Sequence, residues 1–178
     1  MKTKPTNYAY IFSGLPGVGK STIAKMLSSS TKSTYIRIDT LEHCLKKQFS
    51  TPIIKQGYEL AFKLARDNLE VGNNVVIDCC NTTAESRLLL NSLKLAHKTK
   101  TINIEITCED LNEHKHRVNT RCTTNTNRYP SWDEVTKREY EIWDDYEKVL
   151  KIDNSDSTID QSLRELMKGI SKMTSTSS

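Results

Sequence analysis

The stretch that decides the fold is AYIFSGLPGVGKSTIA, residues 9–24. An apolar run typical of a β-strand leads into a glycine-rich turn, and a helix is predicted to begin where the turn ends. Residues 14–21 match the pattern G-x-x-x-x-G-K-S/T. In such a loop the backbone N–H groups surround phosphate oxygens, which requires glycines, and the positive end of the next helix faces the anion. The stretch therefore predicts a site for nucleotide phosphates.

Individual positions of this loop have predicted roles. Lys20 is expected to reach the terminal phosphates of ATP, and the Ser21 hydroxyl is expected to ligate Mg²⁺. A chance match to the full pattern is on the order of one in a hundred for a chain of this size, so an ordinary strand-to-helix turn is the weaker alternative. The remaining residues predicted to bind the nucleotide here are Gly14, Leu15, Pro16, Gly17, Val18, Gly19 and Thr22.

Length and composition limit the classes of protein. A chain of 178 residues with 36% hydrophobic and 27% charged residues is typical of one soluble domain, not of a large motor or a multidomain switch. We expect a single domain over residues 1–172 and a disordered tail over 173–178. The net charge of +4 suits a partner that carries phosphates. Nucleic acid is thus a possible partner, but this charge alone does not favour it.

Cysteine usage and hydropathy add two exclusions. The five cysteines are odd in number and include no C-x-x-C pair, which disfavours a disulfide framework or a zinc site. No stretch approaches the length of a membrane span, and the N-terminus has no apolar run behind its lysines. We therefore expect a cytoplasmic protein without a membrane partner.

Strand and helix patterns alternate along the chain. Strands are predicted at 8–13, 34–39, 74–80, 101–107 and 149–153, and helices at 21–30, 58–72, 83–97, 110–121, 131–150 and 159–170. Mostly apolar strands that alternate with helices predict an α/β fold with a parallel sheet covered on both faces. Ligands of such folds bind at the carboxyl ends of the strands, where Gly14, Asp39 and Asp78 are expected.

Other nucleotide-binding classes lack support in the sequence. A GTPase would need N-K-x-D and D-x-x-G segments, and a transporter ATPase would need its serine-glycine signature; none of these occurs. A small kinase remains. The chain resembles the AAA-type predicted kinases. Five segments carry the resemblance: GLPGVGKSTIA, YIRIDTLE, VVIDCCNTTAESR, CEDLNEHKHRVNTR and PSWDEVTKREYEIWD. That group is related to polynucleotide 5′-kinases, chloramphenicol phosphotransferase, adenylylsulfate kinase and the zeta toxins.

The resemblance covers about residues 8–155. It implies the three-layer fold of P-loop NTPases, with a five-stranded parallel sheet, helices on both faces and a mobile lid. It also implies phosphoryl transfer from ATP, with Mg²⁺, to an acceptor that differs among members. The expected function is therefore an ATP- and Mg²⁺-dependent kinase acting on a hydroxyl of a small metabolite or of a nucleic-acid 5′ end. The alternative is an ATP-binding switch or regulator that transfers no phosphate.

The acceptor side is expected around a second carboxylate. Asp39 matches the position at which related kinases place the residue that orients the acceptor hydroxyl and takes its proton. Alternatively, Asp39 caps the following helix. Glu42, one turn on, either shares the acceptor pocket or completes a capping box with Asp39, and the capping box is the favoured interpretation. By resemblance, Asn81 and Arg87 line the acceptor side, although Arg87 could instead be a surface residue of its helix.

Asp78 ends an apolar strand, where P-loop proteins hold a second carboxylate against Mg²⁺, usually through water. The alternative is a structural carboxylate whose hydrogen bonds are satisfied within the protein.

Arg117 and Arg121 lie four residues apart on one helix face and precede a polar stretch predicted as a lid over about 121–131. Both are expected to contact the nucleotide, with Arg121 counted as catalytic beside Lys20 and Asp39, and Arg128 is a further candidate. The stripe formed by Trp132, Tyr140, Trp143 and Tyr146 is interpreted as helix packing and not as a base-stacking surface.

Overall fold

The computed structural model describes residues 7–49, 55–95, 99–124, 129–144 and 148–175. Strands β1 (Asn7–Ser13), β2 (Thr34–Arg37), β3 (Val75–Asp78), β4 (Thr99–Thr107) and β5 (Val149–Asp153) alternate with helices. The helices are α1 (Lys20–Thr31), α2 (Ile38–Gln48), α3 (Gln56–Glu70), α4 (Ala84–Asn91), α5 (Leu111–Thr124), α6 (Trp132–Thr136) and α7 (Ile159–Ser175), with a 3₁₀ turn at Ser92–Leu95. None of these helices has the length and apolarity that crossing a membrane requires.

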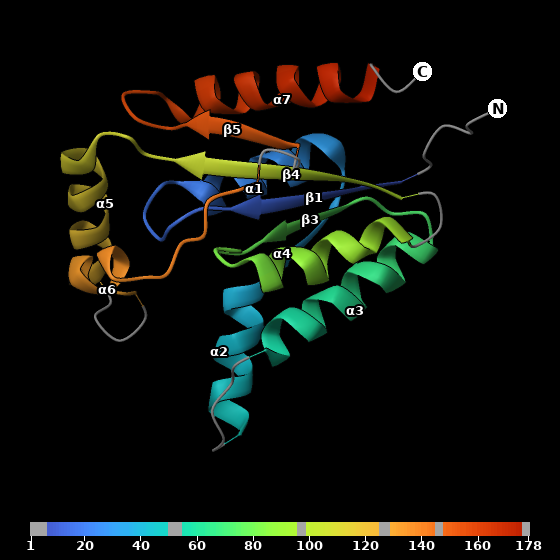
Figure 1. Cartoon of the computed structure of the whole chain (residues 1–178), viewed down its shortest axis with the longest axis horizontal. Helices are drawn as coiled ribbons and strands as arrows, with labels where there is room; N and C mark the ends of the chain where they lie inside the picture. The colour runs from blue at the N-terminus through green and yellow to red at the C-terminus, as the bar shows by residue number, and fades with distance from the viewer. Residues whose placement is uncertain (1–6, 50–54, 96–98, 125–128, 145–147, 176–178) are drawn as a thin grey trace.

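All five strands are parallel, in the order β2-β3-β1-β4-β5. Their carboxyl ends point toward α5 and α6, while β1 begins and α7 ends at the opposite edge (Figure 1). The pairing of β2 with β3 sets Arg37 opposite Asp78, and the P-loop follows β1 directly beside them. The predicted α/β fold with a five-stranded parallel sheet is confirmed.

Each face of the sheet has its own apolar core. On one face, Ile23 and Leu27 of α1 pack with Leu166 of α7 against alternate residues of the central strands. On the other face, Ala61, Ala65 and Leu69 of α3 pack with Leu90 and Leu93. Both sets are buried because the strands between them are apolar on both sides, so the molecule has three layers.

The prediction of a helix over 131–150 is wrong. Helix α6 ends at Thr136, and residues 137–144, here called the strap, have no regular secondary structure. The backbone N–H of Glu141 donates to the Thr82 carbonyl at 2.9 Å, and the Tyr140 hydroxyl donates to the buried Glu105. These tertiary contacts replace the helix that the aromatic spacing indicated, because propensity is weaker than such contacts. Tyr146 lies outside the described residues.

Arg87 fastens the strap to the body of the protein. Its side chain is 2% exposed, and its guanidinium donates to the carbonyl oxygens of Asn81 and Thr82 at 3.2 and 3.4 Å and of Glu141 at 2.5 Å. The Trp143 ring lies 4.1 Å from the guanidinium carbon, and Trp143 is itself buried, as the packing interpretation required. Arg87 is therefore not a surface residue.

Two predicted boundaries change. Helix α7 runs to Ser175, so the first residues of the tail predicted over 173–178 are helical, and 176–178 lie outside the described residues. The first part of the lid predicted over 121–131 is the end of α5, which continues to Thr124. Residues 125–128, including Arg128, also lie outside the described residues.

Replacing Arg87 by methionine tests its anchoring role. The substitution keeps an unbranched side chain but leaves buried carbonyl oxygens without a donor, so the free energy of unfolding should fall by about 2–4 kcal/mol. Urea denaturation followed by circular dichroism measures it. Arg66→Met is the matched control, because Arg66 is exposed on α3 and its ion pair among the described residues is with Glu70, so its loss should cost about 0.5 kcal/mol or less. Equal effects of the two substitutions would show that Arg87 does not hold the strap.

Candidate active site

The P-loop is shaped by three glycines with positive φ angles. Gly14, Gly17 and Gly19 have φ values of 134°, 95° and 94°, which residues with a Cβ rarely adopt. The Gly14 N–H donates to the carbonyl oxygen of Cys80 at 3.0 Å, which ties the end of β1 to the segment after β3. Helix α1 then begins at Lys20, so its N-terminal N–H groups face the loop.

Two buried side chains from distant segments hold the loop from behind. His114 of α5 donates through Nε2 to the Pro16 carbonyl at 2.8 Å, and Asn154, after β5, donates to the Val18 carbonyl at 2.8 Å. Sequence reasoning missed both residues. No local signal could reveal them, because the contacts join residues 98 and 136 positions apart.

Asp78 is the centre of a charged cluster beside the loop. It is 1% exposed; one carboxylate oxygen lies 3.7 Å from the Lys20 ammonium, while the other accepts from the Tyr35 hydroxyl at 2.6 Å and lies 3.5 Å from Arg37 Nε. Burial lowers the pKa of Lys20, but the negative potential of Cys80, Asp78 and Asp39 outweighs it and raises the pKa above its usual range. Lys20 is therefore charged at neutral pH.

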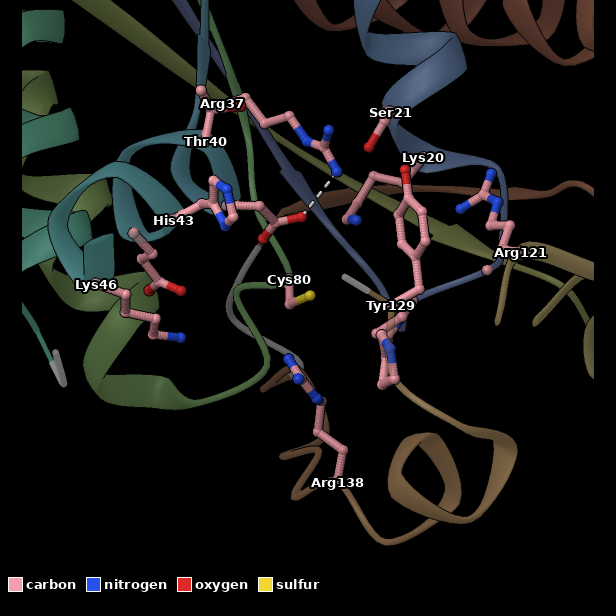
Figure 2. Close-up of a pocket in the computed structure, with 15 residues that line it drawn as sticks. Lys20, Ser21, Arg37, Thr40, His43, Lys46, Cys80, Arg121, Tyr129 and Arg138 are labelled. Atoms are coloured by element: carbon pink, nitrogen blue, oxygen red, sulfur yellow. Dashed lines mark hydrogen bonds and ion pairs between the residues drawn. The ribbon is translucent and has the colours of Figure 1, made fainter. Parts of the chain in front are cut away.

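A cavity of about 320 Å³ opens between the P-loop, α2 and the segments around the strap (Figure 2). It is lined mainly by polar and charged side chains from parts of the chain that are far apart in sequence. Figure 2 shows Lys20, Ser21 and Arg121 on one side and the labelled side chains of α2 across from them, with the Arg37 guanidinium between, next to Ser21 and Lys20. The lining residues are Pro16, Gly17, Lys20, Ser21, Arg37, Asp39, Thr40, Glu42, His43, Lys46, Cys80, Arg121, Tyr129, Pro130 and Arg138.

The cavity brings together only some of the predicted site residues. Lys20, Ser21, Asp39 and Arg121 all line it, together with the loop residues Pro16 and Gly17. The lining does not include the other predicted residues of the loop, which are Gly14, Leu15, Val18, Gly19 and Thr22. It also does not include the candidates outside the loop, which are Asp78, Asn81, Arg87 and Arg117. The lining thus combines Lys20 and Ser21, which the sequence predicts to bind phosphate and Mg²⁺, with the carboxylate of Asp39.

The local position of Asp39 differs from both predictions for it. Strand β2 ends at Arg37, which is the N-cap of α2, so Asp39 lies in the first turn of the helix and is neither at a strand end nor a cap. The capping box expected with Glu42 is absent, because the cap makes no side-chain hydrogen bond. Asp39 instead pairs with Arg37 at 3.0 Å. Burial raises the pKa of Glu42.

Asn81, Arg87 and Arg117 have structural contacts. Asn81 is fully buried at a φ of 48°, with its N–H donating to the Tyr58 hydroxyl. Arg87 holds the strap and faces backbone carbonyls. Arg117 pairs with Glu113 and donates to the Asn154 carbonyl at 2.9 Å, next to Gly19. None of these three side chains lines the cavity, and the substrate contacts expected for Asn81 and Arg87 and the nucleotide contact expected for Arg117 stay predictions.

The lining also includes residues that the sequence did not single out. Thr40, His43 and Lys46 share one face of α2 with Asp39, and helical spacing could have found them once α2 was placed. Arg138 reaches the cavity only because the strap is not helical, which the aromatic stripe concealed.

A pair of alanine substitutions tests the loop geometry. A Cβ at Gly14 would lie 2.3 Å from the Ile106 carbonyl oxygen, whereas a Cβ at Gly72, also at positive φ, would meet nothing within 4 Å. Gly72→Ala should cost about 1 kcal/mol of unfolding free energy, from backbone strain alone. Gly14→Ala should cost about 1–3 kcal/mol more because backbone atoms must shift, and thermal denaturation measures both. Equal losses would contradict the close approach of Gly14 to β4.

Comparisons with solved structures find the same architecture in two kinases and in Kti12. A gluconokinase from Sinorhizobium meliloti 1021 is 13% identical with a TM-score of 0.69, and the match covers 98% of this chain and 97% of that one. The Mycobacterium tuberculosis APS kinase in complex with AMPPNP and APS is 17% identical with a TM-score of 0.66, covering 92% and 97%. Chaetomium thermophilum Kti12 in complex with ADP-AlF3 is 16% identical with a TM-score of 0.64, covering 90% and 97%.

At these identities the likeness shows the fold, and a family model supplies the assignment. Among curated proteins, none matches this chain. The family model described as an AAA domain, AAA_33, matches residues 10–139, which include the P-loop, Asp39, Asp78 and both ends of α5. The chain therefore belongs to the AAA_33 family and has the fold of the P-loop small kinases.

Proposed function

We propose that this protein is a kinase that transfers the γ-phosphate of ATP to a hydroxyl of a small metabolite or of a nucleic-acid 5′ end. The observation that carries the proposal is that Asp39 shares one cavity with Lys20 and Ser21. A protein that only held ATP would have no need of a carboxylate facing the phosphate-binding loop across a cavity. The kinase fold and the nucleotide analogues named for two of the similar structures support ATP as the donor.

The reaction uses groups from both sides of the cavity. The acceptor oxygen forms a bond to the γ-phosphorus as the bond from that phosphorus to the β–γ bridging oxygen breaks, which releases ADP. Asp39 accepts the hydroxyl proton in this step. Lys20 and Arg121 stabilise the negative charge that spreads over the transferring group. The pairing of Asp39 with Arg37 fixes where the carboxylate sits.

Residues next to the loop have the chemistry to hold Mg²⁺, which supplies charge neutralisation on the phosphates when bound. The Ser21 hydroxyl lines the cavity and offers a direct oxygen ligand. Asp78 does not line the cavity, and both its oxygens already contact Lys20, Tyr35 or Arg37. Asp78 would therefore act on the ion through a water molecule, as a residue that orients it.

Two substitutions separate nucleotide binding from transfer. Lys20→Ala removes charge that contacts phosphate before and during transfer, so ATP affinity and turnover should both fall. Asp39→Asn should leave ATP affinity nearly unchanged while turnover falls by roughly 10²-fold or more, the usual scale of general-base loss. Isothermal titration with ATP and Mg²⁺ measures binding, and a screen of hydroxyl metabolites and 5′-hydroxyl oligonucleotides with labelled ATP measures transfer.

Asp67→Asn is the matched control, because Asp67 is an exposed carboxylate on α3, away from the cavity. It should change neither quantity. Absence of ATP binding by the wild-type protein would end the proposal. Transfer at the wild-type rate by Asp39→Asn would remove Asp39 from the reaction, and ATP binding without transfer to any acceptor would favour the regulatory alternative.

A further inference from the structure

The end of the cavity farthest from the P-loop carries positive charge that the phosphates of ATP do not account for. The lining contains five lysines or arginines but only two carboxylates, Asp39 and Glu42. Lys20, Arg37 and Arg121 belong to the half that surrounds the P-loop and Asp78. Lys46 of α2 and Arg138 of the strap belong to the other half, on the acceptor side of Asp39.

The side chains of Lys46 and Arg138 project into the same hollow. In Figure 2, the Arg138 guanidinium reaches from the strap toward Cys80, and Lys46 extends from α2 on the opposite wall. Within the described part of the chain, neither head group takes part in an ion pair or hydrogen bond, whereas the neighbouring Lys137 pairs with Asp133 at 2.7 Å. Both head groups are thus available to a ligand.

Glu42 lies near both cations but carries only one negative charge. Its half-buried position raises the pKa of its carboxyl group, an effect that Lys46 and Arg138 oppose through their positive charge. One carboxylate can balance only one of the two cations. A further anion is needed to balance them when water is displaced from the cavity.

We propose that the phosphate acceptor is a small molecule that carries an anionic group, such as a phosphate, sulfate or carboxylate, in addition to its reacting hydroxyl. Lys46 and Arg138 bind the anionic group while Asp39 faces the hydroxyl. This inference rests on the proposed kinase function and adds the substrate class. An arginine and a lysine on opposite walls suit an oxyanion, to which both donate charge-assisted hydrogen bonds.

The geometry of α2 sets the size of this acceptor. Asp39, Glu42, His43 and Lys46 lie at i, i+3, i+4 and i+7 on one helix face. Seven residues rise roughly 10 Å along a helix, and the Lys46 side chain leans back toward the N-terminus, so hydroxyl and anion should be separated by about 5–10 Å. A cavity of about 320 Å³ is at the small end of ligand pockets, which favours a metabolite over a nucleic-acid strand.

Binding of inorganic phosphate tests the anion site without requiring catalysis. The protein is first loaded with AMPPNP and Mg²⁺, so that the positions of the ATP phosphates are filled, and phosphate is titrated at constant ionic strength by calorimetry. Wild type should bind one phosphate, and the double variant Lys46→Gln, Arg138→Gln should bind it about tenfold more weakly. The matched control is Lys47→Gln, Lys137→Gln, which removes the same charge from adjacent residues outside the lining and should bind as wild type does. No saturable phosphate binding by wild type, or equal binding by all three proteins, would overturn the inference.

Transfer from labelled ATP then tests the substrate class. Ribose 5-phosphate and gluconate are compared with ribose and glucose, and each anionic compound should give a higher kcat/KM than its neutral partner in wild type. The Lys46, Arg138 double variant should remove that preference, and the Lys47, Lys137 control should keep it.

Equal use of neutral and anionic compounds would overturn the inference but leave the proposed kinase function in place. A 5′-hydroxyl oligonucleotide preferred over every small anion would overturn the small-molecule acceptor. Phosphate binding as expected, without transfer to any compound, would leave the anion site in place and reject the kinase.

Discussion

The position of the Asp78 carboxylate is the constraint on which the site depends. A buried charge costs several kcal/mol unless it is paired and hydrogen-bonded, and Asp78 meets that requirement through Lys20, Tyr35 and Arg37. Those partners come from the start of α1 and from β2, so neutralising one carboxylate fixes the P-loop lysine against two neighbouring strands. The same pairing holds Arg37 where it can also bind Asp39, and it thereby links the phosphate side of the cavity to the acceptor side.

In the proposed kinase, this arrangement prepares Lys20 for phosphate before any nucleotide arrives. Lys20 is 6% exposed, so its ammonium has already lost most of its water, and the surrounding negative potential keeps it charged. The desolvation cost is thus met during folding, through Asp78, and phosphate binding does not have to repeat it. His114 and Asn154 act in the same direction, because they hold loop carbonyls away from the cavity and leave the loop N–H groups to face the anion.

The features that the sequence predicted are those set by neighbouring residues. The P-loop pattern, the apolar strands and the buried Asp78 depend on local spacing, so they were found, and the sheet followed from their alternation. The prediction of a helix over 131–150 failed because Arg87 and Glu105, more than thirty residues earlier, bind the strap in a form without regular secondary structure. Asp39 was identified as a candidate, but its place in the first turn of α2 depends on β2 ending at Arg37, a boundary that composition does not mark.

The way the strap is attached separates stability from substrate choice. Arg87 binds the main-chain carbonyl of Glu141, and Thr82 binds its N–H, so two of these contacts do not depend on which side chains the strap carries. Arg138 projects from the same segment into the cavity without a structural contact of its head group among the described residues. Cavity-lining side chains of the strap can therefore change at little cost in folding free energy, whereas the glycines of the P-loop cannot, because backbone atoms occupy the space that a Cβ at Gly14 would need. Under the proposed function, the donor site is fixed by backbone geometry, and the acceptor is selected by replaceable side chains on α2 and the strap.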